Sequence, residues 1–126
     1  MVSAREMIDD RPEENTFRVN RAAFTDGALF DREMADIFDH CWLYLCHESQ
    51  VAEHGDYIAT RMGRHPVFVI RGSDGEIGCY YDACSHRGSK LTGRTSGNAK
   101  TLVCRYHGWC FNADGACTLV RGGEEA

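Results

Sequence analysis

The sequence lacks the features of a membrane-spanning, exported or nucleic-acid-binding protein. No apolar run approaches the roughly 20 residues that a membrane span needs, and the polar N-terminus has no apolar core of a signal peptide. Lys and Arg never stand next to each other, and the formal net charge is −5, whereas nucleic acids and anionic membranes attract clustered positive charge. We therefore expect a cytoplasmic protein with no nucleic-acid or membrane partner.

Proline is also scarce, with two prolines against thirteen glycines in 126 residues. This composition is typical of short elements joined by tight turns. The length suits one compact domain and is too short for two of ordinary size. Apolar residues make up 43% of the chain, which is enough for a hydrophobic core and argues against a disordered chain.

The patterning divides the chain into three parts. Residues 1–16 carry charges at nearly every second position and predict a flexible lead-in, and residues 17–50 contain a helix and a connecting segment. In residues 51–126, apolar alternation between glycine-containing turns predicts short strands. These strands are expected at residues 56–62, 66–71, 77–81, 101–103, 109–111 and 116–120. The fold class is therefore mainly β, an antiparallel sandwich or barrel.

The helix is predicted to begin at Thr25 or Asp26, since either side chain can cap a helix. It is expected to run to about Cys41, because apolar residues recur at intervals of three and four and form one face that packs on the core. Cys41 lies on that face and Cys79 lies within a predicted strand. We therefore expect both thiols to be buried by packing.

Two short segments carry the chemistry: Cys84-Ser85-His86-Arg87-Gly88 and Cys104-Arg105-Tyr106-His107-Gly108-Trp109. Each lies between predicted strands and is therefore a loop, and each supplies one thiolate and one imidazole. Two such loops that face each other can hold a two-iron cluster, with both cysteines on one iron and both histidines on the other. The glycines allow the backbone to bend closely around the inorganic sulfides.

Zinc is the alternative for the same four donors, because Cys2His2 zinc sites use the same ligand types. Such sites usually pair like ligands with at least two residues between them, whereas here one residue separates Cys84 from His86 and each loop mixes the two types. The seven cysteines are odd in number, and without an export signal a disulfide framework is not expected. The pattern therefore favours an iron–sulfur cluster over zinc.

The two segments match in full the C-x-H-R-G and C-x-Y-H-G-W patterns of a known family. The sequence resembles the Rieske domains at the N-terminus of aromatic-ring-hydroxylating oxygenase large (alpha) subunits. The resemblance covers roughly residues 17–120 and includes Trp42-Leu43-Tyr44-Leu45, His47-Glu48-Ser49-Gln50 and Gly55-Asp56-Tyr57. In detail it is most similar to the branch that acts on aromatic carboxylates, such as the benzoate, toluate and anthranilate dioxygenases.

The resemblance implies a Rieske-type [2Fe–2S] cluster in an antiparallel β-sandwich with an N-terminal helix. The ligands of the cluster would be Cys84, His86, Cys104 and His107, and the residues beside it would be Arg87, Gly88, Tyr106, Gly108 and Trp109. Two neutral imidazoles in place of two thiolates make the oxidised site neutral rather than a dianion. The reduction potential therefore rises to about −150 to +300 mV, against about −400 mV for plant-type clusters.

Respiratory Rieske proteins have similar ligands but different neighbours. They carry an extra cysteine in each cluster loop, joined in a disulfide, and a serine hydroxyl that donates to the cluster. This sequence has Ser89 and Tyr106 in place of those cysteines and Trp109 in place of that serine. Fewer hydrogen bonds to sulfur stabilise the reduced form less, so we expect a potential near the low end of the range.

The resemblance also implies an electron route. An NADH-dependent flavin/iron–sulfur reductase or a ferredoxin would reduce the cluster. The cluster would then reduce a mononuclear Fe(II) in a larger C-terminal domain during dihydroxylation of an aromatic carboxylate such as benzoate, a step in the catabolism of aromatic compounds. A small beta subunit would complete the oxygenase.

The 126 residues contain no such catalytic domain, so we expect a truncated alpha subunit that carries electrons and has no catalytic residue of its own. The alternatives are a free-standing Rieske ferredoxin-type carrier and an inactive truncated relic. The predicted helix at residues 26–41 and the segment at residues 47–50 favour the first interpretation, because Rieske ferredoxins usually lack this extension.

Overall fold

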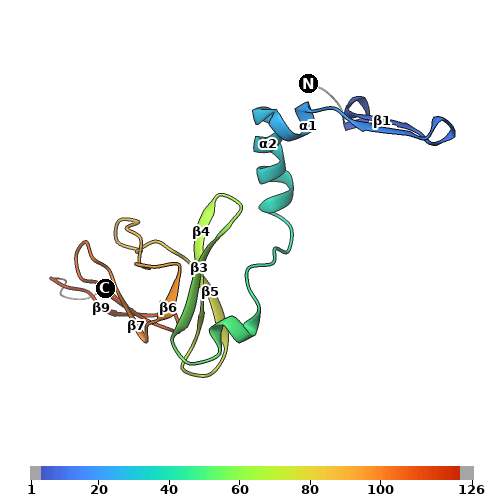
Figure 1. The fold of residues 1–126 in the computed structure, drawn as a ribbon. Coiled ribbons are helices and arrows are strands. Elements are labelled where there is room, and N and C mark those ends of the chain that lie inside the picture. Colours follow the sequence, from blue (N-terminus) through green and yellow to red (C-terminus); the bar gives the residue numbers. More distant parts are fainter. Residues whose placement is uncertain (1–3, 123–126) are drawn as a thin grey trace. The chain divides into compact units, whose positions relative to one another are not determined.

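The computed structural model describes residues 4–122 and divides the chain into two compact units, Met1–Trp42 and Leu43–Ala126. Figure 1 shows the N-terminal unit in blue and cyan and the second unit in green to red. The division falls after Trp42, whereas the sequence analysis placed the boundary of the strand-rich part after Gln50. No helix among the described residues is long and apolar enough to cross a membrane.

The N-terminal unit begins with a hairpin that the sequence analysis did not predict. Strand β1 (Ile8–Arg11) follows the short 3₁₀ helix η1 (Ala4–Met7) and pairs antiparallel with β2 (Thr16–Val19). A second 3₁₀ helix, η2 (Pro12–Glu14), lies in the connection between the two strands. Asn15 turns the chain with a left-handed φ of 50°. The prediction of a lead-in without structure missed this hairpin because both strands are largely exposed, so they show no alternation between buried apolar and solvated polar residues.

The single helix predicted at residues 26–41 consists of two pieces, α2 (Gly27–Glu33) and a wider π-helical turn, η3 (Met34–Phe38). A short helix that was not predicted, α1 (Ala22–Thr25), precedes them. Asp26 caps α2, since its side chain accepts a hydrogen bond of 2.9 Å from the Leu29 backbone N–H. The prediction that the helix reaches Cys41 is wrong. The helix ends at Phe38, so Cys41 lies beyond it and does not extend its apolar face, and the thiol is exposed.

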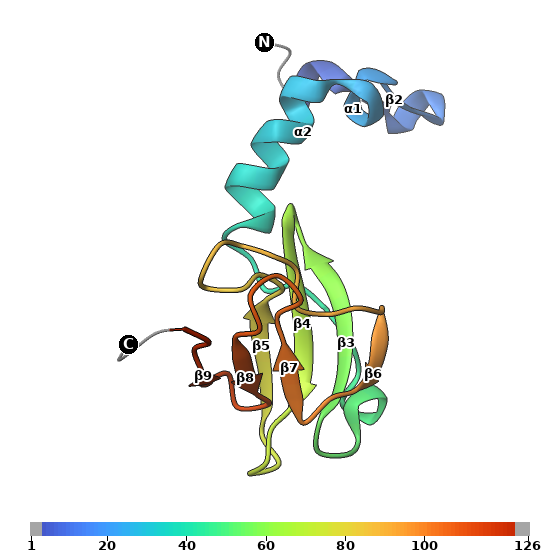
Figure 2. The same ribbon diagram turned by 90° about the vertical axis from the view of Figure 1, so that its left-hand side faces the viewer.

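The second unit contains two antiparallel sheets (Figure 2). The larger sheet has the order β5-β4-β3-β6, and its strands are β3 (Asp56–Met62), β4 (His65–Arg71), β5 (Ile77–Tyr81) and β6 (Ser96–Asn98). The smaller sheet has the order β7-β8-β9, with β7 (Thr101–Val103), β8 (Cys110–Asn112) and β9 (Cys117–Leu119). The mainly β, antiparallel fold predicted from the sequence is confirmed.

The core of this unit lies between the two sheets. Phe68 and Ile70 of β4 face Leu102 of β7 and Phe111 of β8, and the cluster also includes Cys84 and Cys104. The other face of β4 is covered by the 3₁₀ helix η4 (Glu48–Val51), whose Val51 is fully buried. Strand β4 is therefore buried on both faces, and it forms the rigid centre of the larger sheet.

Cys79 is exposed, so the prediction that packing buries it is wrong. The residues of β5 alternate between the two faces of the sheet, and Ile77, Cys79 and Tyr81 take the outer face while Tyr80 packs against the core. Successive residues of a strand point to opposite faces of the sheet, so a place within a strand does not by itself mean burial. The sequence analysis did not consider which face carries Cys79.

Candidate metal centre

Two loops of the second unit have the same backbone frame. In the first ligand loop, residues 84–89, the Cys84 N–H donates to the Ser89 carbonyl at 2.8 Å and the Gly88 N–H donates to the Cys84 carbonyl at 2.7 Å. In the second ligand loop, residues 104–109, the corresponding bonds run from Cys104 to the Trp109 carbonyl at 2.8 Å and from Gly108 to the Cys104 carbonyl at 2.9 Å. Each loop is thus a closed turn that begins with a cysteine.

The glycine in each turn has a left-handed backbone. Gly88 has φ +69° and Gly108 has φ +75°, a region that residues with a Cβ enter only with strain. This conformation lets the chain reverse two residues after His86 and one residue after His107. The glycines therefore help to fix where the two imidazoles stand.

The two cysteines lie together in the interior. Cys84 is 2% exposed and Cys104 is 3% exposed, and both belong to the same buried cluster. The backbone N–H of Tyr106 lowers the pKa of Cys104, with further donation from the N–H of His107. Burial raises the pKa of Cys84, and the neighbouring Cys104 raises it further. Cys104 is consequently the first of the pair to become the thiolate that a metal binds.

The two histidines lie side by side at the partly exposed rim. The ring centroids of His86 and His107 are 4.8 Å apart, with an angle of 61° between the ring planes. Burial lowers the pKa of His86, and the charges of His107 and Arg87 lower it further. The imidazole is therefore held in the neutral form that ligates metals.

The aromatic neighbours of the histidines come mainly from the second loop. Trp109 stacks on His86 with a centroid separation of 4.8 Å and an interplanar angle of 5°. The ring centroids of Tyr106 and His107 are 3.9 Å apart. Arg87 is exposed in the first loop. The second loop thus supports the imidazole of the first across the gap between them.

The donor set fits a two-iron cluster better than a single zinc ion. His107 Nδ1 is buried and has no hydrogen-bond partner, which is unusual for a buried nitrogen and is expected of a metal ligand. No three His, Cys, Asp or Glu side chains within residues 4–122 are grouped as they would be around one ion. A tetrahedral zinc site needs all four donors around one ion, whereas two irons need only a cysteine pair and a histidine pair.

Ser89 is a contributor that the sequence analysis did not identify. Its hydroxyl, from the first loop, lies close to Cys104 of the second loop and, after the backbone N–H groups of Tyr106 and His107, helps to lower the pKa of that thiol. In the sequence analysis Ser89 marked only the absence of a disulfide cysteine. Ser and Cys separated by fifteen positions give no local signal, and the contact becomes visible only when the two loops face each other.

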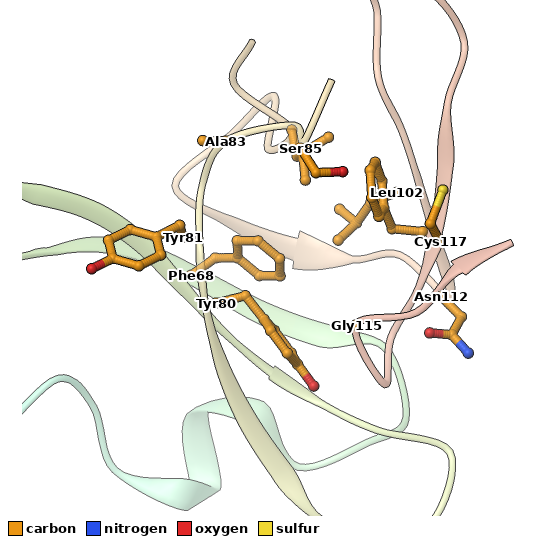
Figure 3. A pocket seen from close by; sticks show the side chains of 11 residues that line it. Phe68, Tyr80, Tyr81, Ala83, Ser85, Leu102, Asn112, Gly115 and Cys117 are labelled. Atoms are coloured by element: carbon orange, nitrogen blue, oxygen red, sulfur yellow. The ribbon is translucent and has the colours of Figure 1, made fainter. Parts of the chain in front are cut away.

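A cavity of about 280 Å³ lies behind the first ligand loop (Figure 3). Ala83, Ser85 and Leu91 line it from the loop side, and core residues of both sheets line the rest, among them Phe68 and Leu102. No residue of the second ligand loop, which lies wholly within the described range, lines this cavity. In the first ligand loop, Ser85 therefore borders open space, whereas the second loop borders none of this cavity.

Comparisons with known proteins agree with this geometry. Residues 41–125 match the family described as the Rieske [2Fe-2S] domain. The chain is 44% identical over 115 residues to toluate 1,2-dioxygenase subunit alpha of Pseudomonas putida, and this match covers 91% of the chain and 25% of that subunit. It is 42% identical over 118 residues to the 2-halobenzoate 1,2-dioxygenase large subunit of Burkholderia cepacia, with 94% and 25% covered.

A solved structure is also similar. Naphthalene 1,2-dioxygenase from a Rhodococcus species, bound to indole, superposes with a TM-score of 0.80 at 35% sequence identity. The match covers 86% of this chain and 24% of that one. The chain thus spans about a quarter of the length of the curated relatives that it matches.

Proposed function

The chain belongs to the Rieske [2Fe-2S] domain family, and we propose that it transfers single electrons through a cluster held by Cys84, His86, Cys104 and His107. A bound [2Fe–2S] cluster supplies reversible one-electron chemistry. One observation carries the assignment of the ligands: the two loops bring two buried thiols together on one side and two imidazoles, 4.8 Å apart, on the other.

The cysteine pair secures the inner side of the site. Both thiols are nearly inaccessible to water, so the sulfur ligands are protected from oxidation and from exchange with solvent. The N–H groups of Tyr106 and His107 donate to Cys104. These donors stabilise negative charge on sulfur, and so they favour the thiolate that binds a metal.

The histidine pair forms the outer side of the site. His86 and His107 are partly exposed at the rim, whereas the cysteines are buried. As neutral ligands, the imidazoles favour a ferrous over a ferric ion, so they place the transferred electron on the rim side of the site. Electrons then enter and leave through the histidine edge, which a redox partner can approach.

Anaerobic reconstitution with ferrous iron and sulfide tests this function. We expect about two irons and two sulfides per chain, and an optical spectrum that bleaches when dithionite is added. The same chain offered zinc serves as the control. Stoichiometric zinc binding together with no uptake of sulfide would overturn the proposed function in favour of a structural metal site.

We further propose that the chain acts within an aromatic-ring-hydroxylating dioxygenase as the electron-input part of its alpha subunit, acting on an aromatic carboxylate. The proposal is supported by similarity to alpha subunits over more than nine-tenths of the chain, with toluate and 2-halobenzoate dioxygenases among the relatives. The electron donor would be an NADH-dependent flavin/iron–sulfur reductase or a ferredoxin. A separate catalytic domain would supply the mononuclear Fe(II), and a small beta subunit would complete the assembly.

Reading the transcript past the Ala126 codon tests this role. A frame that continues into a domain with two histidines and a carboxylate would support it. A stop codon would leave a free-standing carrier or an inactive relic. The purified, cluster-loaded chain would then be mixed with NADH and the reductase of a toluate dioxygenase system, and reduction of the cluster would separate a working carrier from a relic.

A further inference from the structure

We propose that Asp82 is the positioning residue of the first ligand loop: its buried carboxylate ties the two ends of the segment 82–92 together and so holds Cys84 and His86 in place. The inference rests on the proposed cluster function, since it concerns how the chain presents two of the four ligands. It assigns a role to a residue outside the two cluster motifs.

The carboxylate of Asp82 has several donors around it. Asp82 is 3% exposed and lies two residues before Cys84. Its Oδ1 accepts the backbone N–H groups of Leu91 at 3.0 Å and Thr92 at 2.9 Å, and its Oδ2 accepts the Thr92 hydroxyl. The ammonium group of Lys90 lies 3.7 Å from Oδ2. A buried charge with this many donors is compensated and holds its partners in one geometry.

The same residue is attached to the rigid centre of the larger sheet. The backbone N–H of Asp82 donates to the Pro66 carbonyl in β4 at 2.9 Å. Leu91 and Thr92 are themselves buried, so their N–H groups need acceptors inside the protein, and the carboxylate supplies both. These hydrogen bonds of Asp82 form a clamp. The clamp connects β4 to both ends of the segment 82–92, which contains the first ligand loop.

The second ligand loop needs no such clamp. It connects two strands that pair directly, with Val103 of β7 opposite Cys110 of β8, so the sheet itself closes the loop. The first loop leaves β5 after Tyr81, and the next strand, β6, pairs with β3 and not with β5. The two loops share one backbone frame, but paired strands hold the ends of the second loop together, whereas the Asp82 side chain holds together the segment around the first.

The cavity behind the first loop increases its dependence on the clamp. Ala83, Ser85 and Leu91 border a space of about 280 Å³ (Figure 3), so side chains do not fill the volume next to these three residues. With the carboxylate removed, the segment can move into that space. We therefore expect the loss of Asp82 to loosen the first loop and to leave the second unchanged.

The test uses the full 126-residue chain loaded anaerobically with ferrous iron and sulfide. Two quantities are measured: the rate at which a ferrous chelator removes the cluster, and hydrogen exchange in peptides that cover residues 84–92 and 104–109. For Asp82→Ala we expect cluster loss at least about tenfold faster, with faster exchange in residues 84–92 alone.

Conservative variants separate positioning from general destabilisation. Asp82→Asn keeps Oδ1 as acceptor for both N–H groups, and its amide can donate to the Thr92 hydroxyl, so its cluster loss should stay within about threefold of the wild-type rate. Thr92→Val removes one hydrogen bond and should accelerate the loss by about threefold to tenfold, whereas Thr92→Ser should not. Asp114→Ala, which removes an exposed carboxylate that bonds Ser73, is the matched control.

The outcomes are distinct. Exchange that rises equally in both ligand loops, or cluster loss in Asp82→Ala no faster than in Asp114→Ala, would overturn the inference. If Asp82→Ala does not fold, the Thr92→Val and Thr92→Ser pair decides in the same way. A wild-type chain that takes up neither iron nor sulfide would instead refute the proposed function.

Discussion

The two ligand loops are built alike and supported differently. Both begin with a buried cysteine, both are closed by a pair of equivalent backbone hydrogen bonds, and both turn at a left-handed glycine. The second loop bridges two paired strands, while the first depends on the Asp82 carboxylate and on Trp109, which reaches across from the second loop. Two loops with the same backbone turn can thus be held in place by different parts of the fold.

The largest effect is expected from substitutions that remove one ligand from either loop, which test whether both loops are needed to hold the cluster. Cys84→Ala and His107→Ala should each abolish the cluster, because an iron that loses one of its two protein ligands is no longer held. Iron and sulfide per purified chain are the measurement. Cys117→Ala, which removes an exposed free thiol, is the control and should retain both. Full iron and sulfide in either ligand variant would refute the assignment.

The next effect compares the two glycines. Gly88→Ala and Gly108→Ala should each lower the free energy of unfolding by about 1–2 kcal/mol, because alanine is strained at positive φ. A Cβ at Gly88 meets nothing within 4 Å and one at Gly108 meets only the flexible Arg121 side chain, so the two losses should be similar. Urea titrations of the loaded chain provide the measurement.

Gly27→Ala is the control for these two substitutions, since Gly27 lies in α2 with open space around it and without a positive φ. It should cause no loss of stability. A glycine variant in one ligand loop that costs nothing, while the other costs the expected amount, would show that the loops do not share one backbone frame.

A smaller effect concerns the contact between the loops. Ser89→Ala removes the hydroxyl that lies close to Cys104 and helps to lower its pKa, and it should lower the reduction potential because negative charge in the reduced form loses a nearby polar group. A difference of about 1 kcal/mol corresponds to roughly 40 mV for one electron. Ser85→Ala, in the same loop, is the control for the redox titration. An unchanged or raised potential in Ser89→Ala would contradict this role.

The smallest effect lies at the other end of the sheets, where an exposed carboxylate joins two turns. The Ser73 backbone N–H, followed by the Ser73 hydroxyl, lowers the pKa of Asp114 from the usual 3.8. A lowered pKa in the folded state gives stability that is present above the unfolded pKa and is lost as the pH falls through the folded value. Asp114→Asn should therefore be slightly less stable than the wild type at neutral pH, with the difference shrinking below about pH 4.

Unfolding measured at pH 7 and at pH 3 tests the acid dependence. A difference between the two proteins that grows on acidification would contradict the sign. Neither ligand loop should respond to this substitution, so cluster content in Asp114→Asn should equal that of the wild type. Asp114 therefore serves as a control for Asp82, because it is a hydrogen-bonded carboxylate that is exposed and lies outside the ligand loops.

Much of the fold followed from local pattern. Strands β3, β5 and β7 have the predicted bounds, because apolar residues alternate between clear turn signals. Strand β8 is displaced by one residue from the prediction. The sequence analysis missed β6, whose Ser-Gly-Asn sequence has little strand propensity. Pairing with β3 holds it in place, where Asn98 lies opposite Asp56 and donates to its carboxylate.

The candidate site shows the same limit. The spacing of cysteine and histidine identified the four proposed ligands, which the fold brings together, and their assignment stays a prediction. The supporting residues could not be identified in this way. The Asp82 carboxylate accepts a hydrogen bond from Thr92, ten positions away across an irregular segment, and Ser89 lies close to Cys104 of the other loop. Such contacts depend on the path of irregular segments, which no repeating sequence pattern predicts.

The most direct test of the central claim is a redox titration of the reconstituted chain, followed by its visible absorption. A cluster with two imidazole ligands and few hydrogen bonds to sulfur should give a one-electron midpoint between about −150 and +100 mV. A midpoint near about −400 mV would indicate four thiolate ligands and contradict the assignment of His86 and His107. A value above about +100 mV would contradict the expected scarcity of hydrogen bonds to sulfur.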